Sequence, residues 1–158
     1  MSRKTTPTYV LLNQITLAAA SSSVTFSNIP QNYGDLVLVS DFSGSDIDTR
    51  IVINNDNTAA NYPSVVMRGL GSGSGQSFTS SQGIGYVGSG ARGYIQSQIM
   101  DYSATDKHKT ILNRDSDSSL QVVARAIRWA NTSAVNTVAV AGDSAFAIGS
   151  TFSLYGVN

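Results

Sequence analysis

Residues 22–27 read Ser-Ser-Val-Thr-Phe-Ser, and residues 36–42 read Leu-Val-Leu-Val-Ser-Asp-Phe. In the first stretch Val24 and Phe26 flank Thr25, so apolar and polar side chains alternate with the period of two that places them on opposite faces of a strand. Both stretches are rich in β-branched and aromatic residues, which favour strands. These segments therefore predict β-strands with one buried face and one solvated face.

The same pattern recurs along the whole chain, in short runs separated by clusters of Gly, Asn, Asp and Ser. Strands this short and this numerous, with no helical segments between them, favour two antiparallel sheets packed face to face. We therefore expect an all-β fold, an antiparallel β-sandwich of the jelly-roll or a related Greek-key kind, with about eight to ten strands. The predicted strands are residues 8–17, 22–27, 36–42, 49–53, 64–70, 92–101, 108–114, 120–129, 135–141 and 150–157.

The first seven residues differ from the rest of the chain. They read MSRKTTP, are polar and basic, and end at Pro7, which disfavours a helix at the residue before it. We predict an extended N-terminal arm over residues 1–7 and a single β-sandwich domain over residues 8–158, because 158 residues are enough to bury one core. Such arms often reach onto neighbouring molecules.

Residues 71–90, GSGSGQSFTSSQGIGYVGSG, hold seven of the fourteen glycines and no charged residue. This composition predicts one or two flexible loops. Apolar residues are spaced through the segment at Phe78, Ile84, Tyr86 and Val87, and such residues often become ordered only against a partner. Phe78 and Tyr86 are therefore candidate partner contacts. The alternative is a hairpin tip that folds back on its own sheet.

The composition argues against several functional classes. Charged residues make up only 13% of the chain, against a usual share of about 25%. The formal net charge is zero and the Arg and Lys residues are scattered, so we expect no nucleic-acid binding. No apolar run reaches the ~18 residues that a membrane helix needs. The chain has no cysteine, which removes disulfides, thiolate metal sites and cysteine nucleophiles.

Two glycine-rich stretches resemble functional motifs but lack the context that those motifs need. Gly83-Ile-Gly-Tyr-Val-Gly88 matches the dinucleotide-binding pattern G-x-G-x-x-G, which requires a strand before it and a helix after it. Ser and Gln precede it here, and Ser and Gly follow it. GSGSG at residues 71–75 has its serines in the wrong places for a nucleophile elbow. We expect no cofactor.

The single histidine is His108, between Lys107 and Lys109. A lone His can act as a general base, but only Asp106 is near in sequence to orient it. We therefore interpret His108 as part of a solvated turn and expect no catalytic residue.

Two acidic clusters could bind a cation. Asp41, Asp46 and Asp48 lie in DFSGSDID, and Asp115 and Asp117 lie in RDSDSS. Oxygen ligands two residues apart can hold Ca²⁺, but Asp is also an ordinary turn residue whose side chain bonds its own backbone. The turn interpretation is favoured, so no metal site is expected.

Several short segments, spread over residues 11–157, carry a resemblance to a known family. The chain resembles small virion structural proteins of tailed bacteriophages, including those that infect cyanobacteria. The closing strand that ends in Leu-Tyr-Gly is the most telling of these segments. The similar parts are Ser23-Val-Thr-Phe-Ser-Asn-Ile-Pro30 with Tyr33, Leu36-Val-Leu-Val39, Ile99-Met-Asp-Tyr-Ser103, Lys107-His-Lys-Thr110, Trp129, Thr132-Ser-Ala-Val-Asn-Thr-Val138 and Gly149-Ser-Thr-Phe-Ser-Leu-Tyr-Gly156.

The resemblance implies a homotrimeric β-sandwich subunit of the virion, made in the bacterial host cytoplasm, without catalytic residues. Such proteins decorate capsids as cement proteins or belong to tails and fibres. The chain shows no heptads or long shaft repeats, which favours decoration of the capsid surface. The expected partners are further copies of the chain and the major capsid protein or other virion proteins. Arg3 and Lys4 of the arm are the predicted shell contacts.

Two alternatives remain open at this point. A tail or tail-fibre component could bind a host-surface glycan through loop aromatics such as Tyr86 and Trp129. An enzyme such as a glycan hydrolase would need two carboxylates about 5 to 10 Å apart, which only Asp could supply here.

Overall fold

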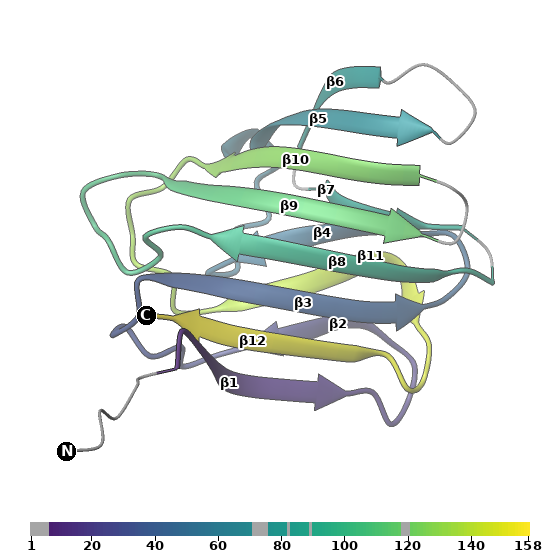
Figure 1. Cartoon of the computed structure of the whole chain (residues 1–158), viewed down its shortest axis with the longest axis horizontal. Coiled ribbons are helices and arrows are strands. Elements are labelled where there is room, and N and C mark those ends of the chain that lie inside the picture. Colours follow the sequence, from purple (N-terminus) through teal and green to yellow (C-terminus); the bar gives the residue numbers. More distant parts are fainter. Residues whose placement is uncertain (1–6, 71–75, 82, 89, 118–120) are drawn as a thin grey trace.

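The computed structural model describes residues 7–70, 76–81, 83–88, 90–117 and 121–158. These residues form twelve strands and one short 3₁₀ helix, η1 (Figure 1). In chain order they are β1 (Tyr9–Thr16), β2 (Ser21–Phe26), β3 (Asp35–Ser43), β4 (Ile47–Ile53), η1 (Ala59–Asn61), β5 (Pro63–Leu70), β6 (Gln76–Ser81), β7 (Gly83–Val87), β8 (Arg92–Ile99), β9 (Lys109–Asp117), β10 (Gln121–Trp129), β11 (Val138–Phe146) and β12 (Thr151–Val157).

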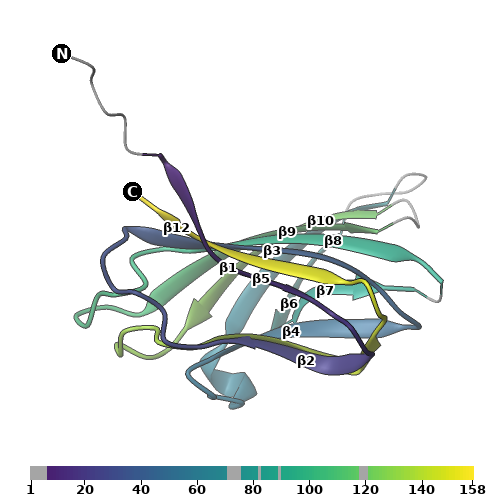
Figure 2. The ribbon, with the colours of Figure 1, turned by 90° about the horizontal axis from the view of Figure 1, so that it is seen from below.

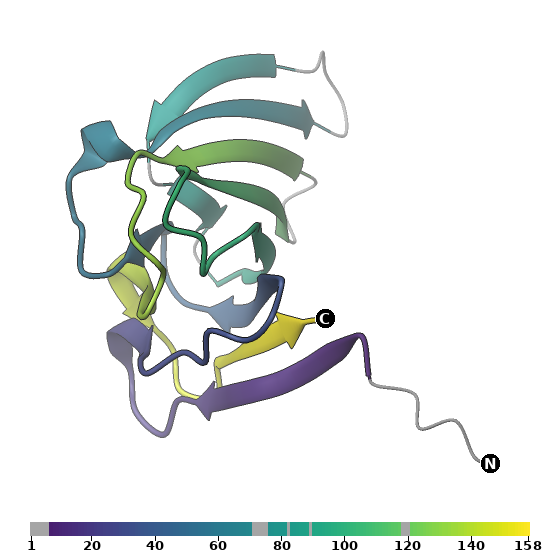
Figure 3. The ribbon, with the colours of Figure 1, turned by 90° about the vertical axis from the view of Figure 1, so that its left-hand side faces the viewer.

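The strands form two antiparallel sheets of unequal size that pack face to face (Figure 2). The larger sheet has eight strands in the order β1-β12-β3-β8-β9-β10-β5-β6, and the smaller has four in the order β2-β11-β4-β7. The first residues of β1 extend away from the sandwich on the side of the eight-stranded sheet (Figure 3). The predicted antiparallel β-sandwich is thus confirmed, while its jelly-roll character stays a prediction.

Ten of the twelve strands overlap a range that the sequence predicts, although β11 begins three residues later and ends five residues later than predicted. The other two strands correct one prediction. Strands β6 and β7 both fall inside residues 71–90, which we expected to be loop. Strand β6 forms an antiparallel hairpin with β5, as in the alternative interpretation, and β7 crosses to the smaller sheet and pairs with β4. The backbone hydrogen bonds of these two strands outweigh the glycine- and serine-rich composition that predicts a loop.

The core lies between the sheets and is formed by the alternate residues of each strand. On β8, for example, Ile95 and Ile99 are buried, while Tyr94 on the opposite face is exposed. Three phenylalanines from β3, β11 and β12 pack together, with the Phe146 ring 5.2 Å from Phe42 and 5.1 Å from Phe152. Edge-to-face packing at these distances adds to the stabilisation from burial.

Two glycines allow the edge of the smaller sheet to approach the larger one. A Cβ on Gly85 of β7 would lie 2.4 Å from Cδ1 of Ile95, and a Cβ on Gly93 of β8 would lie 2.1 Å from Cγ2 of Val87. The middle glycine of the G-x-G-x-x-G match is therefore needed for close packing between sheets. The packing explains this residue without a dinucleotide.

A buried lysine holds the loops at one end of the sandwich. The Lys109 ammonium donates hydrogen bonds to the carbonyls of Ala104 at 2.7 Å, Lys107 at 3.0 Å and Thr132 at 3.2 Å. Its side chain is fully buried, and burial lowers the pKa of Lys109 below its usual range. The three carbonyls satisfy the three donors of the ammonium, as a buried charge requires.

Asp56 fixes the connection between β4 and β5. Its carboxylate accepts hydrogen bonds from Trp129 Nε1 at 2.9 Å, Asn61 Nδ2 at 2.8 Å and the Thr58 amide at 2.9 Å. The hydrogen bonds from Asn61 and Trp129 are the main reason that the pKa of Asp56 falls to about 2. The connection is thus tied to the end of β10.

A buried polar network joins the two sheets where β7 meets the inner face of the larger sheet. Arg125 of β10 forms an ion pair with Asp115 of β9, and both side chains are nearly inaccessible to solvent. Arg125 and Asn113 also donate hydrogen bonds to the carbonyl of Ile84, at 3.0 and 2.6 Å. Burial is the main influence on Arg125 and lowers its pKa. The network anchors the edge strand of the smaller sheet.

Candidate functional site

The outer faces of the two sheets differ in which side chains they expose. Ten large apolar residues are exposed in the described part of the chain, and only Tyr86 of these lies on a strand of the smaller sheet. An antiparallel sheet with a solvated face usually carries polar residues there. The larger sheet departs from this rule, and its outer face is the candidate functional surface. The exposed apolar residues on its strands are Tyr9, Leu11, Val65, Met67, Tyr94, Leu112 and Val122.

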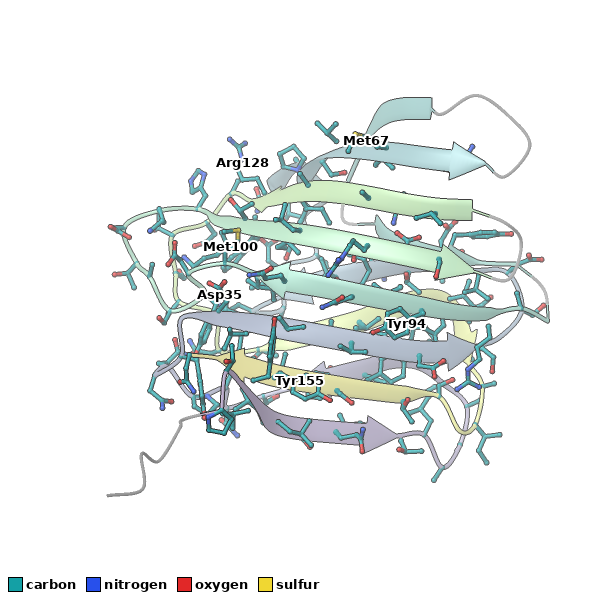
Figure 4. The ribbon with its side chains drawn as sticks, viewed as in Figure 1. Asp35, Met67, Tyr94, Met100, Arg128 and Tyr155 are labelled. Atoms are coloured by element: carbon teal, nitrogen blue, oxygen red, sulfur yellow. The ribbon has the colours of Figure 1, made fainter. Side chains whose placement is uncertain are left out.

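A shallow groove of about 510 Å³ lies on this outer face over β5, β8, β9 and β10. Strand register brings its apolar residues together, because Leu112 pairs with Ala126 and Ala126 pairs with Val65. Met67 is 62% exposed and Val65 is 56% exposed, so both side chains reach solvent. Figure 4 shows Met67 on the same face as Tyr94 and Tyr155. The groove residues are Val65, Met67, Gln96, Gln98, Leu112, Asn113, Arg114, Ala124, Arg125 and Ala126.

A second hollow of about 540 Å³ adjoins the groove at the end of β10. The two share Val65 and Ala126, and the second adds Pro63, Thr110 and Arg128. Together they form one surface over β5, β8, β9 and β10, which we call the outer groove. The volume of each hollow taken separately lies in the range of known binding sites, about 300 to 1,000 Å³.

The outer groove contains two arginines that have no acidic partner in the described residues. Arg114 donates a hydrogen bond to Gln96 Oε1 at 2.8 Å, and the Arg128 side chain makes neither an ion pair nor a hydrogen bond within the described ranges. Both are exposed. Arg92 of β8 differs, because its guanidinium holds Asp41 through two hydrogen bonds at 2.6 and 2.8 Å. The positive charge of the groove is therefore available to a partner.

The structure separates the predicted contact residues. Arg3 and Lys4 lie outside the described residues. Phe78 lies on β6 opposite Val66, and its side chain is outside the description. Tyr86 lies on β7 in the other sheet, where its hydroxyl donates a hydrogen bond to Asp46 Oδ1 at 3.0 Å. Phe78 and Tyr86 therefore belong to different sheets and do not form one loop surface.

Three acidic residues of the predicted clusters are engaged in contacts within the chain, and the side chain of Asp117 lies outside the description. Asp41 pairs with Arg92, Asp46 accepts the hydroxyl hydrogen of Tyr86, and Asp115 is buried against Arg125. The pKa of Asp48 is raised, first by burial and then by the negative charge of Asp143. Within the described residues no group of three or more His, Cys, Asp or Glu side chains could hold a metal ion.

The two remaining candidates are His108, which is exposed, and Trp129, which is buried. His108 is exposed in the turn before β9, in line with the predicted solvated turn. Trp129 is 1% exposed, and its Nε1 donates to Asp56, so its ring is not available as a stacking platform. The glycan-binding role considered for Trp129 is therefore wrong.

Two short apolar runs in the sequence could have predicted the outer groove. Strands β5 and β10 include the runs Val65-Val-Met67 and Val122-Val-Ala124, in which apolar residues occupy both faces. Strands covered on both faces read as continuous apolar runs. On a sheet with only one covered face, such a run marks an outer surface suited to a partner.

Comparison of the chain with family models, with curated proteins and with solved structures finds no match. In the described ranges no helix is long and apolar enough to cross a membrane.

Proposed function

We propose that this chain is a non-enzymatic structural protein of a bacteriophage particle, which binds the head shell as a homotrimeric decoration protein and stabilises it. The single observation that supports a packing role is the apolar outer groove on the eight-stranded sheet. Exposed apolar patches with polar rims mark interaction surfaces. The phage particle and the trimer are what the resemblance of the sequence implies.

The proposed role has a simple physical mechanism. A trimer seated where shell subunits meet would bury surface on several neighbours at once. Dissociation would then require breaking all of these contacts together, so that multivalency replaces strong single bonds. The poorly charged, Ser-, Thr- and Asn-rich remainder of the surface suits close packing between molecules.

Electron microscopy of antibody-labelled particles tests this proposal. Purified phage particles are labelled with an antibody raised against this chain and imaged in negative stain. We expect labels distributed over the head. Labels confined to the tail would support a tail component, and particles without label would contradict the virion role. The same antibody on particles of an unrelated phage is the control.

A further inference from the structure

We propose that the outer groove binds an extended segment of a partner protein in which two carboxylates flank an aliphatic side chain, with Arg114 and Arg128 as the carboxylate-binding residues. This inference rests on the proposed packing role, because it names the chemistry of the surface that the chain packs against. It does not depend on the partner being a phage shell.

The floor of the groove is aliphatic and suits an aliphatic side chain. Leu112, Ala124 and Ala126 lie side by side on β9 and β10, and Val65 and Met67 extend the surface onto β5. Covering these side chains removes apolar surface from water at about 25 cal/mol per Å². Among the described residues no aromatic side chain lines the groove, and Tyr94 lies in a different row of the sheet, opposite Ser116. A sugar ring would favour an aromatic platform, so the lining favours a protein over a glycan.

The two arginines fix the charge pattern of the partner. Arg128 pairs across the strands with Thr110, which precedes Arg114 by four positions on β9. Strand geometry then gives a separation of about 14 Å between the two Cα atoms. In an extended peptide, carboxylates four residues apart are separated by a similar distance, about 13 Å. Guanidinium groups bind carboxylates with two parallel hydrogen bonds, which adds orientation to charge attraction.

A second copy of this chain does not offer that pattern in an extended segment, because its ten acidic residues are all Asp and no two of them lie four positions apart. Asp41 and Asp101 form ion pairs with Arg92 and Lys107, and Asp46 and Asp143 accept hydrogen bonds from their own chain. Withdrawing them would break contacts that the chain already makes. The geometry therefore points to a different protein as the occupant.

The test is a solution NMR titration of the full chain with the peptide Ser-Asp-Thr-Leu-Thr-Asp-Ser, blocked at both ends. We expect saturable shifts at the amides of Leu112, Ala124 and Ala126. The double variant Arg114→Gln, Arg128→Gln should bind about tenfold more weakly, as should a peptide with Asn in place of both Asp. Arg50→Gln, an exposed arginine on the smaller sheet, is the matched control and should leave the affinity unchanged.

Several outcomes would overturn the proposal. Equal affinity for the Asp and Asn peptides, equal weakening by Arg50→Gln, or no saturable shift at the groove amides would each do so. Sedimentation measures the oligomeric state of the chain with and without the double substitution. If the double variant lost self-association, the groove would bind a second copy of the chain and not a different protein. Antibody labels on the head without peptide binding would refute the peptide-binding role of the groove and leave the virion role standing. Peptide binding without labels on the particle would refute the virion role and leave the groove proposal standing.

Discussion

The two faces of strand β9 show two opposite uses of polar and apolar side chains. On the inner face, Asn113 and Asp115 are buried and their polar atoms are hydrogen-bonded or ion-paired. On the outer face, Leu112 is 46% exposed, and next to it Arg114 has no acidic partner in the described residues. The polar groups of these two residues therefore have their partners within the chain. On the outer face, by contrast, Leu112 and Arg114 are left exposed, and the proposed partner segment would cover Leu112 and neutralise Arg114.

The smaller sheet shows that this arrangement is not a general property of the fold. Its outer face carries Ser23, Thr25, Asp48 and Arg50, which are exposed polar residues, in the alternation expected of a solvated sheet. The same chain therefore obeys the usual rule on one outer face and departs from it on the other. The difference supports the proposal that the eight-stranded sheet is the side that meets a partner.

The largest loss of stability is expected from breaking the buried ion pair on the inner face. Asp115→Ala leaves the Arg125 guanidinium buried without its carboxylate and should lower the free energy of unfolding by about 3 to 5 kcal/mol. Urea denaturation followed by circular dichroism measures this. Asp41→Ala, which breaks the exposed pair with Arg92, is the matched control and should cost less than about 1 kcal/mol. Equal losses would mean that the buried network does not hold the sheets together.

A smaller loss of unfolding free energy is expected at low pH, where protonation of Asp56 weakens its hydrogen bond with Trp129. The pKa of Asp56 is about 2 in the folded chain, below the value of about 3.9 in an unfolded chain. A group with a depressed folded pKa stabilises the fold above its unfolded pKa, and this contribution is lost as the pH falls through the folded pKa. Because solvent reaches and screens this carboxylate, we expect a loss of only about 1 kcal/mol between pH 4 and about 2.

Asp56→Asn provides the control for this pH dependence. The variant should show a shallower decline in unfolding free energy over the same pH range, measured by urea denaturation at each pH. An unchanged slope would assign the acid sensitivity to other carboxylates. The intrinsic fluorescence of Trp129, the only tryptophan, reports directly on the contact.

The sequence predicted the strands better than it predicted the surfaces. Alternation at Val24 and Phe26, and similar patterns elsewhere, located ten strands because the period of two is a local property. Strands β6 and β7 were missed because their glycines and serines are ordinary loop residues, and only pairing with β5 and β4 makes them strands. The pairing of β7 with β4 is a long-range contact, and the hairpin of β5 with β6 depends on backbone hydrogen bonds; composition encodes neither.

The apolar runs of β5 and β10 could mark the outer surface in the sequence, but the meeting of its two arginines could not be predicted, for a related reason. Arg114 and Arg128 are fourteen positions apart, and only the register between β9 and β10 brings them to one groove. The contacts of Lys109 and Trp129 were likewise not predictable, because their partners come from other loops. The predicted contacts Phe78 and Tyr86 were chosen from one segment, and the chain divides that segment between two sheets.

The smallest effect on stability is expected on the outer face, and it tests the comparison most directly. Leu112→Ala should change the free energy of unfolding by no more than about 0.5 kcal/mol, since surface substitutions rarely do more. Its neighbour Ile111 is fully buried, and Ile111→Ala should cost about 2 to 5 kcal/mol. Urea denaturation of both variants gives the contrast. If Leu112→Ala cost as much as Ile111→Ala, Leu112 would be part of the chain's own core, and the outer groove could not be a surface kept for a partner.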